Sequence, residues 1–461
     1  MNHSITASII CFIAAVFCAV TLSSSSFISI ALLPAVFLVG FLMFFRGSVK
    51  NSDTRITAIL LYSLFFVRMV FIPVYGIFDG YYEGTVSSSL SKYCNNTVAL
   101  SSYEYIIVCI LFYLVVSNRK NNVYSPNSLY LSGNKTVYLI VILIALLLFI
   151  TRGRHLGLFE FGLKSVGGSL ERSGDIEDGN YLKSFISVGI TFCFLLITSI
   201  FVKKYRLSLA SKYVTYSIIL AMMMICIISG ERRTSLIYKG FACTWLLVGL
   251  YPKYKKKTTR LLLMVAVIVI AGMTLYKQYN AFLYGTYAEA LSHARNVGMS
   301  TGMLDAYFYG LNTISKNLAF ADTGRVDVIN LLYDLARNIF GLNFIVPKGY
   351  PLTSQLYNLS LSLGESQTGY LLSSVGYGYI FFGFYLSPIF TCFNVMIMVG
   401  LERAMRKAKS IEMSYVLAFL FMRFGFGFLG SIPPLLNLTT KMLITYGGLF
   451  LVASFLNKSI K

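Results

Sequence analysis

The chain has 461 residues, of which 56% are hydrophobic and only 12% are charged, and its mean hydropathy is +0.70. This composition excludes an ordinary water-soluble domain, in which about a quarter of the residues are charged. The net charge of +21 comes from 39 basic and 18 acidic residues. Much of this charge lies in short segments between apolar blocks, so it does not indicate a nucleic-acid-binding protein.

Apolar residues occur in blocks of about twenty, the length that a helix needs to cross about 30 Å of hydrocarbon. The sequence therefore predicts an all-α polytopic membrane protein with about twelve membrane-spanning helices. We expect residues 1–461 to form a single integral membrane domain. In chain order, the twelve blocks are 5–22, 27–45, 56–78, 102–117, 136–151, 182–202, 213–229, 234–250, 261–278, 370–400, 412–430 and 440–456.

Basic residues gather after alternate blocks, in the segments 46–55, 119–120, 203–212, 253–260 and 403–409. The positive-inside rule assigns such segments to the cytoplasm, so both termini are expected to be cytoplasmic. Two outer segments are large, and we call 152–181 the first large loop and 279–369 the second large loop. Each carries several basic residues, against the positive-inside trend. The topology permits this, because large outer segments can cross the membrane regardless of their charge.

The second large loop is rich in Tyr, Leu, Phe and Asn, unlike a disordered linker. Apolar residues recur at helical spacing over 325–340, which predicts an amphipathic helix that lies on the membrane or on the helix bundle. A weaker pattern predicts a second helix over 303–320. Because so long a loop is usually functional, the sequence indicates a site at the outer membrane surface.

A short outer hairpin over residues 229–235 contains two adjacent arginines, Arg232 and Arg233, after Glu231. Guanidinium groups match phosphate oxygens in geometry, and the start of the following helix also favours an anion. We therefore expect the hairpin arginines to bind a diphosphate. The alternative is that they are ordinary interfacial arginines that pair with Glu231.

Arginines of the two large loops are the other candidates for anion binding. In the first large loop, we expect Arg154 and Arg172 to bind a diphosphate or an acidic glycan, and a solvated turn is the alternative. In the second large loop, we expect Arg295, Arg325 and Arg337 to bind an anion.

Two further residues are candidate functional residues because of their type and position. His293, in the second large loop, is a candidate general base, because histidine accepts a proton from a sugar hydroxyl near neutral pH. Arg68 lies within the third apolar block, where a charge is costly unless it is functional or paired. We expect Arg68 to contact the headgroup of a lipid substrate, and pairing inside the bundle is the alternative.

The sequence contains no P-loop and no HExxH, CxxC or Asp-x-Asp motif. We therefore expect no metal and no cofactor. These absences are compatible with a metal-free transfer from an activated lipid donor, in which cationic side chains stabilise a leaving diphosphate.

The chain resembles the Wzy-type O-antigen polymerases, or oligosaccharide repeat unit polymerases, of bacterial inner membranes. The resemblance covers nearly the whole length and rests on about twelve spans, cytoplasmic termini and two large periplasmic loops that flank a short hairpin. Locally, residues 230–234 resemble the Gly-x-Arg turn of the family. Residues 337–347, followed by Pro351, resemble its Arg, aromatic-rich and Pro pattern, and the small residues over 364–383 resemble the entry to its next span.

The resemblance implies a fold like that of the lipid-dependent, GT-C-like glycosyltransferases. It implies that a growing glycan is transferred from undecaprenyl diphosphate to the non-reducing end of another undecaprenyl-diphosphate-linked repeat unit at the periplasmic face. The implied partners are this lipid-linked oligosaccharide, membrane lipids and a chain-length regulator. On this reading the diphosphate ligands are Arg232 and Arg233 with Arg295 or Arg337, and the base is His293, Glu231 or Asp305.

Two alternatives remain open at this point. An O-antigen ligase has similar spans and an arginine-bearing loop but uses lipid A core as its acceptor. A flippase or transporter of the lipid-linked oligosaccharide predicts internal repeats, charges deep in several spans and short outer loops.

Overall fold

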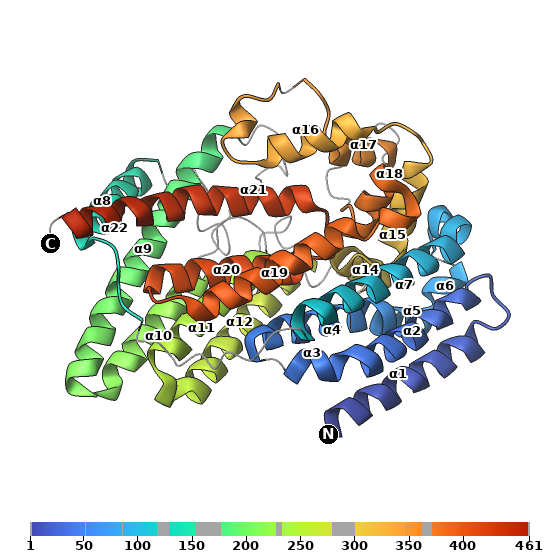
Figure 1. Ribbon diagram of the computed structural model, residues 1–461, viewed down its shortest axis with the longest axis horizontal. Helices are drawn as coiled ribbons and strands as arrows, with labels where there is room; N and C mark the ends of the chain where they lie inside the picture. The colour runs from blue at the N-terminus through green and yellow to red at the C-terminus, as the bar shows by residue number, and fades with distance from the viewer. Residues whose placement is uncertain are drawn as a thin grey trace. The chain divides into compact units, whose positions relative to one another are not determined.

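The computed structural model describes residues 2–50, 52–84, 86–117, 129–152, 177–226, 233–278, 300–347, 349–361 and 371–459 (Figure 1). Over these ranges the chain is helical, and its only β-type pairings are two isolated bridges, Tyr130 with Ser410 and Ser373 with Gly430. The predicted all-α class is therefore confirmed for the described residues. The chain divides into two compact units, each with its own packing.

Unit 1 comprises residues 1–123, 299–403 and 423–441. Its helices begin with α1 (Asn2–Thr21), η1 (Ile28–Ala31), α2 (Leu32–Gly40), η2 (Phe41–Phe45), α3 (Arg46–Lys50), η3 (Ser52–Thr54), α4 (Arg55–Phe66), η4 (Val67–Phe71), α5 (Ile72–Phe78), α6 (Tyr81–Gly84) and α7 (Ser88–Ser117). After the gap they are α14 (Thr301–Phe308), α15 (Leu311–Ala321), α16 (Val328–Asn338), η8 (Leu342–Phe344), α17 (Thr353–Leu361), α18 (Ser374–Leu386), α19 (Ile389–Lys407) and α21 (Ile432–Met442).

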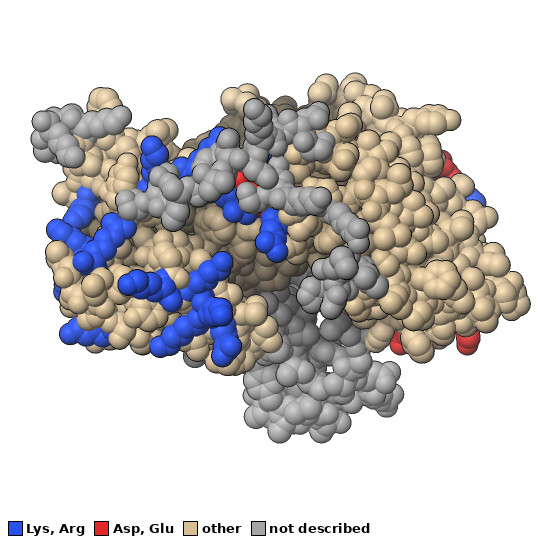
Figure 2. Space-filling view, turned by 60° about the horizontal axis from the view of Figure 1, so that its bottom comes forward, with Lys and Arg blue, Asp and Glu red and all other residues tan. Residues whose placement is uncertain are grey.

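Unit 2 comprises residues 124–298, 404–422 and 442–461. Its helices are α8 (Lys135–Arg152), α9 (Glu177–Ser208), α10 (Ser211–Cys226), α11 (Arg233–Leu250), η6 (Pro252–Tyr254), α12 (Lys255–Gln278), most of α20 (Ile411–Gly427), η9 (Leu443–Gly447) and α22 (Gly448–Ser459). Exposed basic residues gather at the α9–α10 and α11–α12 turns, and Figure 2 shows most of the visible Lys and Arg side chains in the left part of the face in view.

Helices in the described part of the chain have the length and apolarity that a membrane crossing requires. The five that qualify alone are Ile28–Phe45, Arg55–Phe78, Ser88–Val116, Ser184–Ser208 and Ile432–Asn457. Together α18 and α19 form a sixth candidate, and shorter apolar helices lie at Thr6–Thr21, Lys135–Thr151, Ser211–Cys226 and Leu236–Leu250. These helices indicate a multi-pass membrane protein. The number of twelve spans stays a prediction.

The block 370–400, predicted as one span, consists of two helices that meet at an angle of 109°. Two glycines of α18 have special geometry close to this bend. Gly383 has φ of +71°, a conformation that other residues rarely adopt. A Cβ on Gly378 would lie 2.1 Å from the backbone oxygen of Ser387, so α18 returns closely against the start of α19. The pair is a broken span or a re-entrant segment.

The helices predicted in the second large loop are present, with one correction. The amphipathic helix over 325–340 is confirmed as α16, whereas the helix over 303–320 is divided into α14 and α15 at Tyr309, which has φ of +52°. Among the apolar residues of α16, Ile329 and Leu332 are each 63% exposed, while Leu331 is buried. Part of the predicted apolar stripe therefore faces outward, as expected for a helix that meets lipid.

Candidate functional site

Buried polar contacts hold the helices of the second large loop as a folded layer. At its start, the Asp79 carboxylate, just after α5, accepts hydrogen bonds from the Thr301 backbone nitrogen at 3.0 Å and the Thr301 hydroxyl at 2.8 Å. These donors lower the pKa of Asp79 and place its charge at the amino terminus of α14, where a negative charge is favoured. The loop is therefore fixed to the end of a predicted span.

Asp305, a predicted catalytic base, connects α14 to α15. Its side chain is 3% exposed, and its carboxylate accepts the backbone N–H of Asn312 at 3.0 Å and that of Thr313 at 2.8 Å. The Thr313 hydroxyl donates a third hydrogen bond at 2.9 Å. Burial raises the pKa of Asp305, and the hydrogen bonds oppose this effect. Because the carboxylate is enclosed and caps α15, the expectation that it contacts an acceptor hydroxyl is corrected to a positioning role.

A second buried junction joins α15 to the start of α18. The Asn317 side-chain oxygen accepts hydrogen bonds from the Ser373 backbone nitrogen at 3.0 Å and the Ser373 hydroxyl at 2.8 Å. Gly376 makes room for this contact, since a Cβ there would lie 2.2 Å from the Asn317 oxygen. The second large loop and the start of α18 are therefore packed together in unit 1.

Asp334 on α16 was not among the predicted site residues, yet it joins three helices. Its carboxylate accepts the Thr353 backbone N–H at 3.0 Å, on α17, and the Tyr377 hydroxyl at 2.7 Å, on α18. The side chain is 3% exposed, and burial raises its pKa. The usable sequence signal was its position three residues before Arg337 on a predicted helix.

One turn further along α16, Arg337 lies at the surface with two tyrosines. The guanidinium carbon is 6.0 Å from the centre of the Tyr333 ring, and Nη1 donates to the Tyr350 backbone oxygen at 3.4 Å. The two tyrosine rings are 5.0 Å apart at 64°. We call Arg337, Tyr333 and Tyr350 the Arg337 cluster. A part-exposed guanidinium beside aromatic rings suits phosphate oxygens and sugar rings together.

The other predicted residues within the described ranges lie elsewhere in unit 1. Arg325 is exposed in the turn between α15 and α16, where it is accessible to an anion. Arg68 is 1% exposed and forms an ion pair with Glu104 on α7. Its expected contact with a lipid headgroup is therefore corrected to the alternative of pairing inside the bundle. Glu104 was overlooked because it lies 36 positions from its partner.

The remaining predicted residues fall where the structure gives no side-chain description. Arg233 is the first residue of α11, and its side chain is outside the described residues. Outside the described ranges altogether lie Arg154, Arg172, Glu231, Arg232, His293 and Arg295. Within the described part of the chain, no three or more His, Cys, Asp or Glu residues form a group that could hold a metal ion.

Comparison with known proteins gives no assignment: no family model, no curated protein and no solved structure matches the chain. The class that the fold defines is a helical protein with several helices able to cross a membrane. Within that class, the folded outer loop with its arginine–tyrosine cluster is the feature that favours a particular activity.

Proposed function

We propose that the protein is a glycosyltransferase of the bacterial inner membrane that polymerises O-antigen repeat units in lipopolysaccharide biosynthesis. It transfers a growing glycan from undecaprenyl diphosphate to the non-reducing end of another undecaprenyl-diphosphate-linked repeat unit at the periplasmic face. The observation that carries the proposal is the Arg337 cluster, a part-exposed guanidinium with two tyrosine rings. Arg337 and Tyr333 lie on α16, whose exposed residues include Ile329 and Leu332 and suit a position at the lipid surface.

The chemistry requires one bond to break and one to form. The bond between the donor sugar's anomeric carbon and the diphosphate oxygen breaks, and an acceptor hydroxyl oxygen bonds to that carbon and gives its proton to a base. The leaving diphosphate gains negative charge, and in this proposal the guanidinium of Arg337 stabilises it. Tyr333 and Tyr350 offer faces for the sugar rings. As further diphosphate ligands we propose Arg232, Arg233, Arg295 and Arg325, and as bases His293 and Glu231.

Buried acidic residues in unit 1 bear on the transporter alternative, which predicts several intramembrane charges. Glu104 pairs with Arg68. Glu402 on α19 accepts the backbone N–H groups of Ile56 and Thr57 at 3.2 and 2.8 Å, so it caps the start of α4. Both acids are engaged in helix packing, a role that needs no transport function. The observation therefore does not favour a transporter over the enzyme.

The surface polysaccharide ladder of a strain that lacks this chain tests the proposal. The strain is complemented with wild type, Arg337→Ala, Arg337→Lys or the control Arg260→Ala, an exposed arginine on α12. We expect core with a single repeat unit in the deletion, no rescue by Arg337→Ala, partial rescue by Arg337→Lys and full rescue by Arg260→Ala, at equal protein levels.

The other ladders would contradict the proposal in distinct ways. Core without any glycan points to a ligase or a flippase. These two are separated by extracting the lipid carrier, which bears polymerised glycan only when ligation is the missing step. An unchanged ladder overturns the glycan function altogether.

A further inference from the structure

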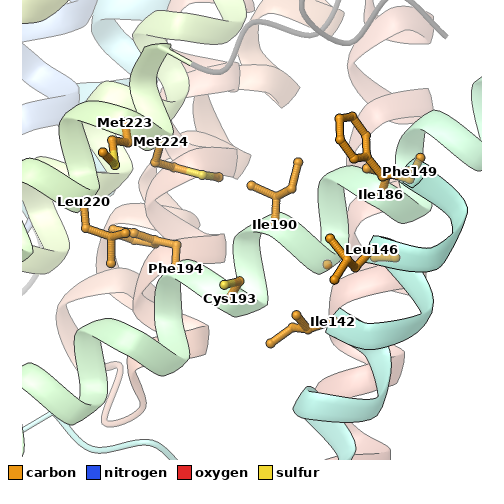
Figure 3. Close-up of a pocket in the computed structure, with 12 residues that line it drawn as sticks. Ile142, Leu146, Phe149, Ile186, Ile190, Cys193, Phe194, Leu220, Met223 and Met224 are labelled. Atoms are coloured by element: carbon orange, nitrogen blue, oxygen red, sulfur yellow. The ribbon is translucent and has the colours of Figure 1, made fainter. Parts of the chain in front are cut away.

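Unit 2 contains an apolar groove of about 330 Å³ between α8, α9 and α10 (Figure 3). Ile142 and Phe149 of α8 form one side, Leu220 and Met223 of α10 form the other, and Ile190 of α9 lies between them. All the lining residues are apolar. At about 30 Å³ for each water-sized group, the groove has room for about eleven methylene groups.

The groove follows from the way the three helices pack. Gly189 of α9 meets α8 so closely that a Cβ there would lie 2.2 Å from the Cβ of Ala145. On the other side, the Phe201 ring of α9 is 5.8 Å from the Tyr216 ring of α10. Gly189 and Ala145 themselves line the groove where α9 approaches α8. The ring contact between α9 and α10 lies further along α9, beyond the groove. Ser184–Ser208 of α9 is a span candidate, so the groove lies where lipid chains are the surrounding solvent.

Exposed lysines lie at one end of the groove's helices. Lys203 and Lys204 are in the last turns of α9, and Lys212 is in the first turn of α10. The Phe201–Tyr216 contact brings these two helix ends together. At 1.5 Å per residue, the lysines are about 12–15 Å along the helices from Leu220 and Phe194, where the groove begins. This distance is within one leaflet of a bilayer with about 30 Å of hydrocarbon.

We propose that this groove is a binding site for an anionic phospholipid, with one acyl chain between α8 and α10 and the phosphate held by Lys203, Lys204 and Lys212. The positive-inside rule assigns these lysines to the cytoplasmic side, so the lipid belongs to the cytoplasmic leaflet. The proposed glycan transfer occurs at the periplasmic face, and the lipid site does not depend on it. Charge selects an anionic headgroup, and the groove volume matches the distal part of a single acyl chain.

Lipid retention by the full-length protein tests the proposal. The protein is purified in a mild detergent, mixed with phosphatidylglycerol or phosphatidylcholine, and examined by native mass spectrometry for bound lipid. Ile190→Trp fills the groove, and a triple Lys203→Gln, Lys204→Gln and Lys212→Gln variant removes the cations. We expect wild type to retain one phosphatidylglycerol with at least about tenfold preference over phosphatidylcholine, and both variants to lose that preference.

Matched controls use the same substitutions at positions outside the groove. Leu147→Trp on α8 changes a side chain that is 63% exposed and does not line the groove. A triple Lys255→Gln, Lys256→Gln and Lys257→Gln variant removes equal charge from the start of α12. Both controls are expected to retain lipid as wild type does. If Ile190→Trp lowers the midpoint of thermal unfolding, Ile190→Phe replaces it.

Three results would overturn the proposal. The first is that both the groove-filling variant and the lysine variant retain phosphatidylglycerol as well as wild type does. The second is equal retention of phosphatidylcholine and phosphatidylglycerol. The third is complete displacement of phosphatidylglycerol by an equal concentration of undecaprenyl phosphate, which would assign the groove to the isoprenoid carrier.

Discussion

Arg68 and Glu104 form an ion pair inside unit 1, with Arg68 Nη1 2.7 Å from Glu104 Oε2 and side-chain exposures of 1% and 0%. Arg68 Nη2 also donates to the Ser101 hydroxyl at 3.0 Å, and the Thr391 hydroxyl donates to the other Glu104 oxygen. The pair therefore joins η4, α7 and α19. An isolated buried charge would cost free energy, and each residue of the pair neutralises the charge of the other.

Removing one partner of this pair should be more harmful than removing both. We expect Arg68→Met or Glu104→Met alone to lower the free energy of unfolding by about 3–5 kcal/mol, because an unpaired charge then stays buried. The double Arg68→Met, Glu104→Met variant should lose clearly less than the sum. Thermal unfolding in detergent checks this, with the exposed Lys92→Met on α7 as the control. Additive losses in the double variant would contradict the pairing.

Substitutions of Asp305 test whether the residue has a positioning role or a catalytic one. Asp305→Ala leaves the Asn312 and Thr313 donors unsatisfied and should cost about 1–3 kcal/mol of stability. Asp305→Asn keeps one acceptor oxygen and should lose less. In both variants, glycan transfer should fall only in proportion to the amount of folded protein. An Asp305→Asn protein with wild-type thermal stability and no transfer would restore the role of general base.

Asp334 gives the loop layer a pH-dependent stability. Burial raises the pKa of its carboxyl in the folded state above the usual value, so ionisation disfavours the fold. The contribution of this group to stability is fully present below its unfolded pKa and is lost as pH rises through the folded pKa. Acidification from about pH 7 to about pH 4 should therefore raise the unfolding temperature of wild type relative to Asp334→Asn. A difference that is constant with pH would refute the shift.

The bend between α18 and α19 depends on Gly378. In Gly378→Ala the new Cβ would lie 2.1 Å from the Ser387 oxygen, a backbone atom that cannot rotate away. We expect a loss of about 1–3 kcal/mol from overpacking. Gly400→Ala on α19 is the matched control, because a Cβ there meets no atom within 4 Å. That change should be neutral or stabilising by about 0.4–1 kcal/mol. Equal unfolding temperatures for the two variants would argue against the close return of α18.

Local patterns in the sequence predict a large part of this fold. Apolar blocks predict the positions of helices because burial in lipid demands length and hydrophobicity along a continuous stretch. Helical spacing predicts α16, and residue type predicts Arg337 as a surface anion ligand. The bend near Gly378 and Gly383 could not be predicted in this way, because the sequence stays apolar through it. The bend becomes evident only from the close contact between Gly378 and Ser387.

Partners distant in the chain limit prediction of the site. Glu104 and Tyr377 become partners of Arg68 and Asp334 only when separate helices meet, and no periodicity encodes such meetings. The role of Asp305 likewise depends on the break after α14, which places the start of α15 against its carboxylate. The carboxylate of Asp305 suggested a general base, whereas its burial and the three hydrogen bonds it accepts indicate that it positions α15.

The outward side of α16 also governs how a ligand would reach the Arg337 cluster. Besides Ile329 and Leu332, two apolar residues just beyond the helix are exposed. Phe344 is 65% exposed and Ile345 is 79% exposed. Side chains of this kind immerse in the acyl boundary and fix the height of the helix relative to the headgroups. A lipid-anchored molecule would then meet the cluster by diffusing sideways in the plane of the membrane. Encounter would depend on its surface density in that leaflet, and a water-soluble analogue without the anchor would compete poorly.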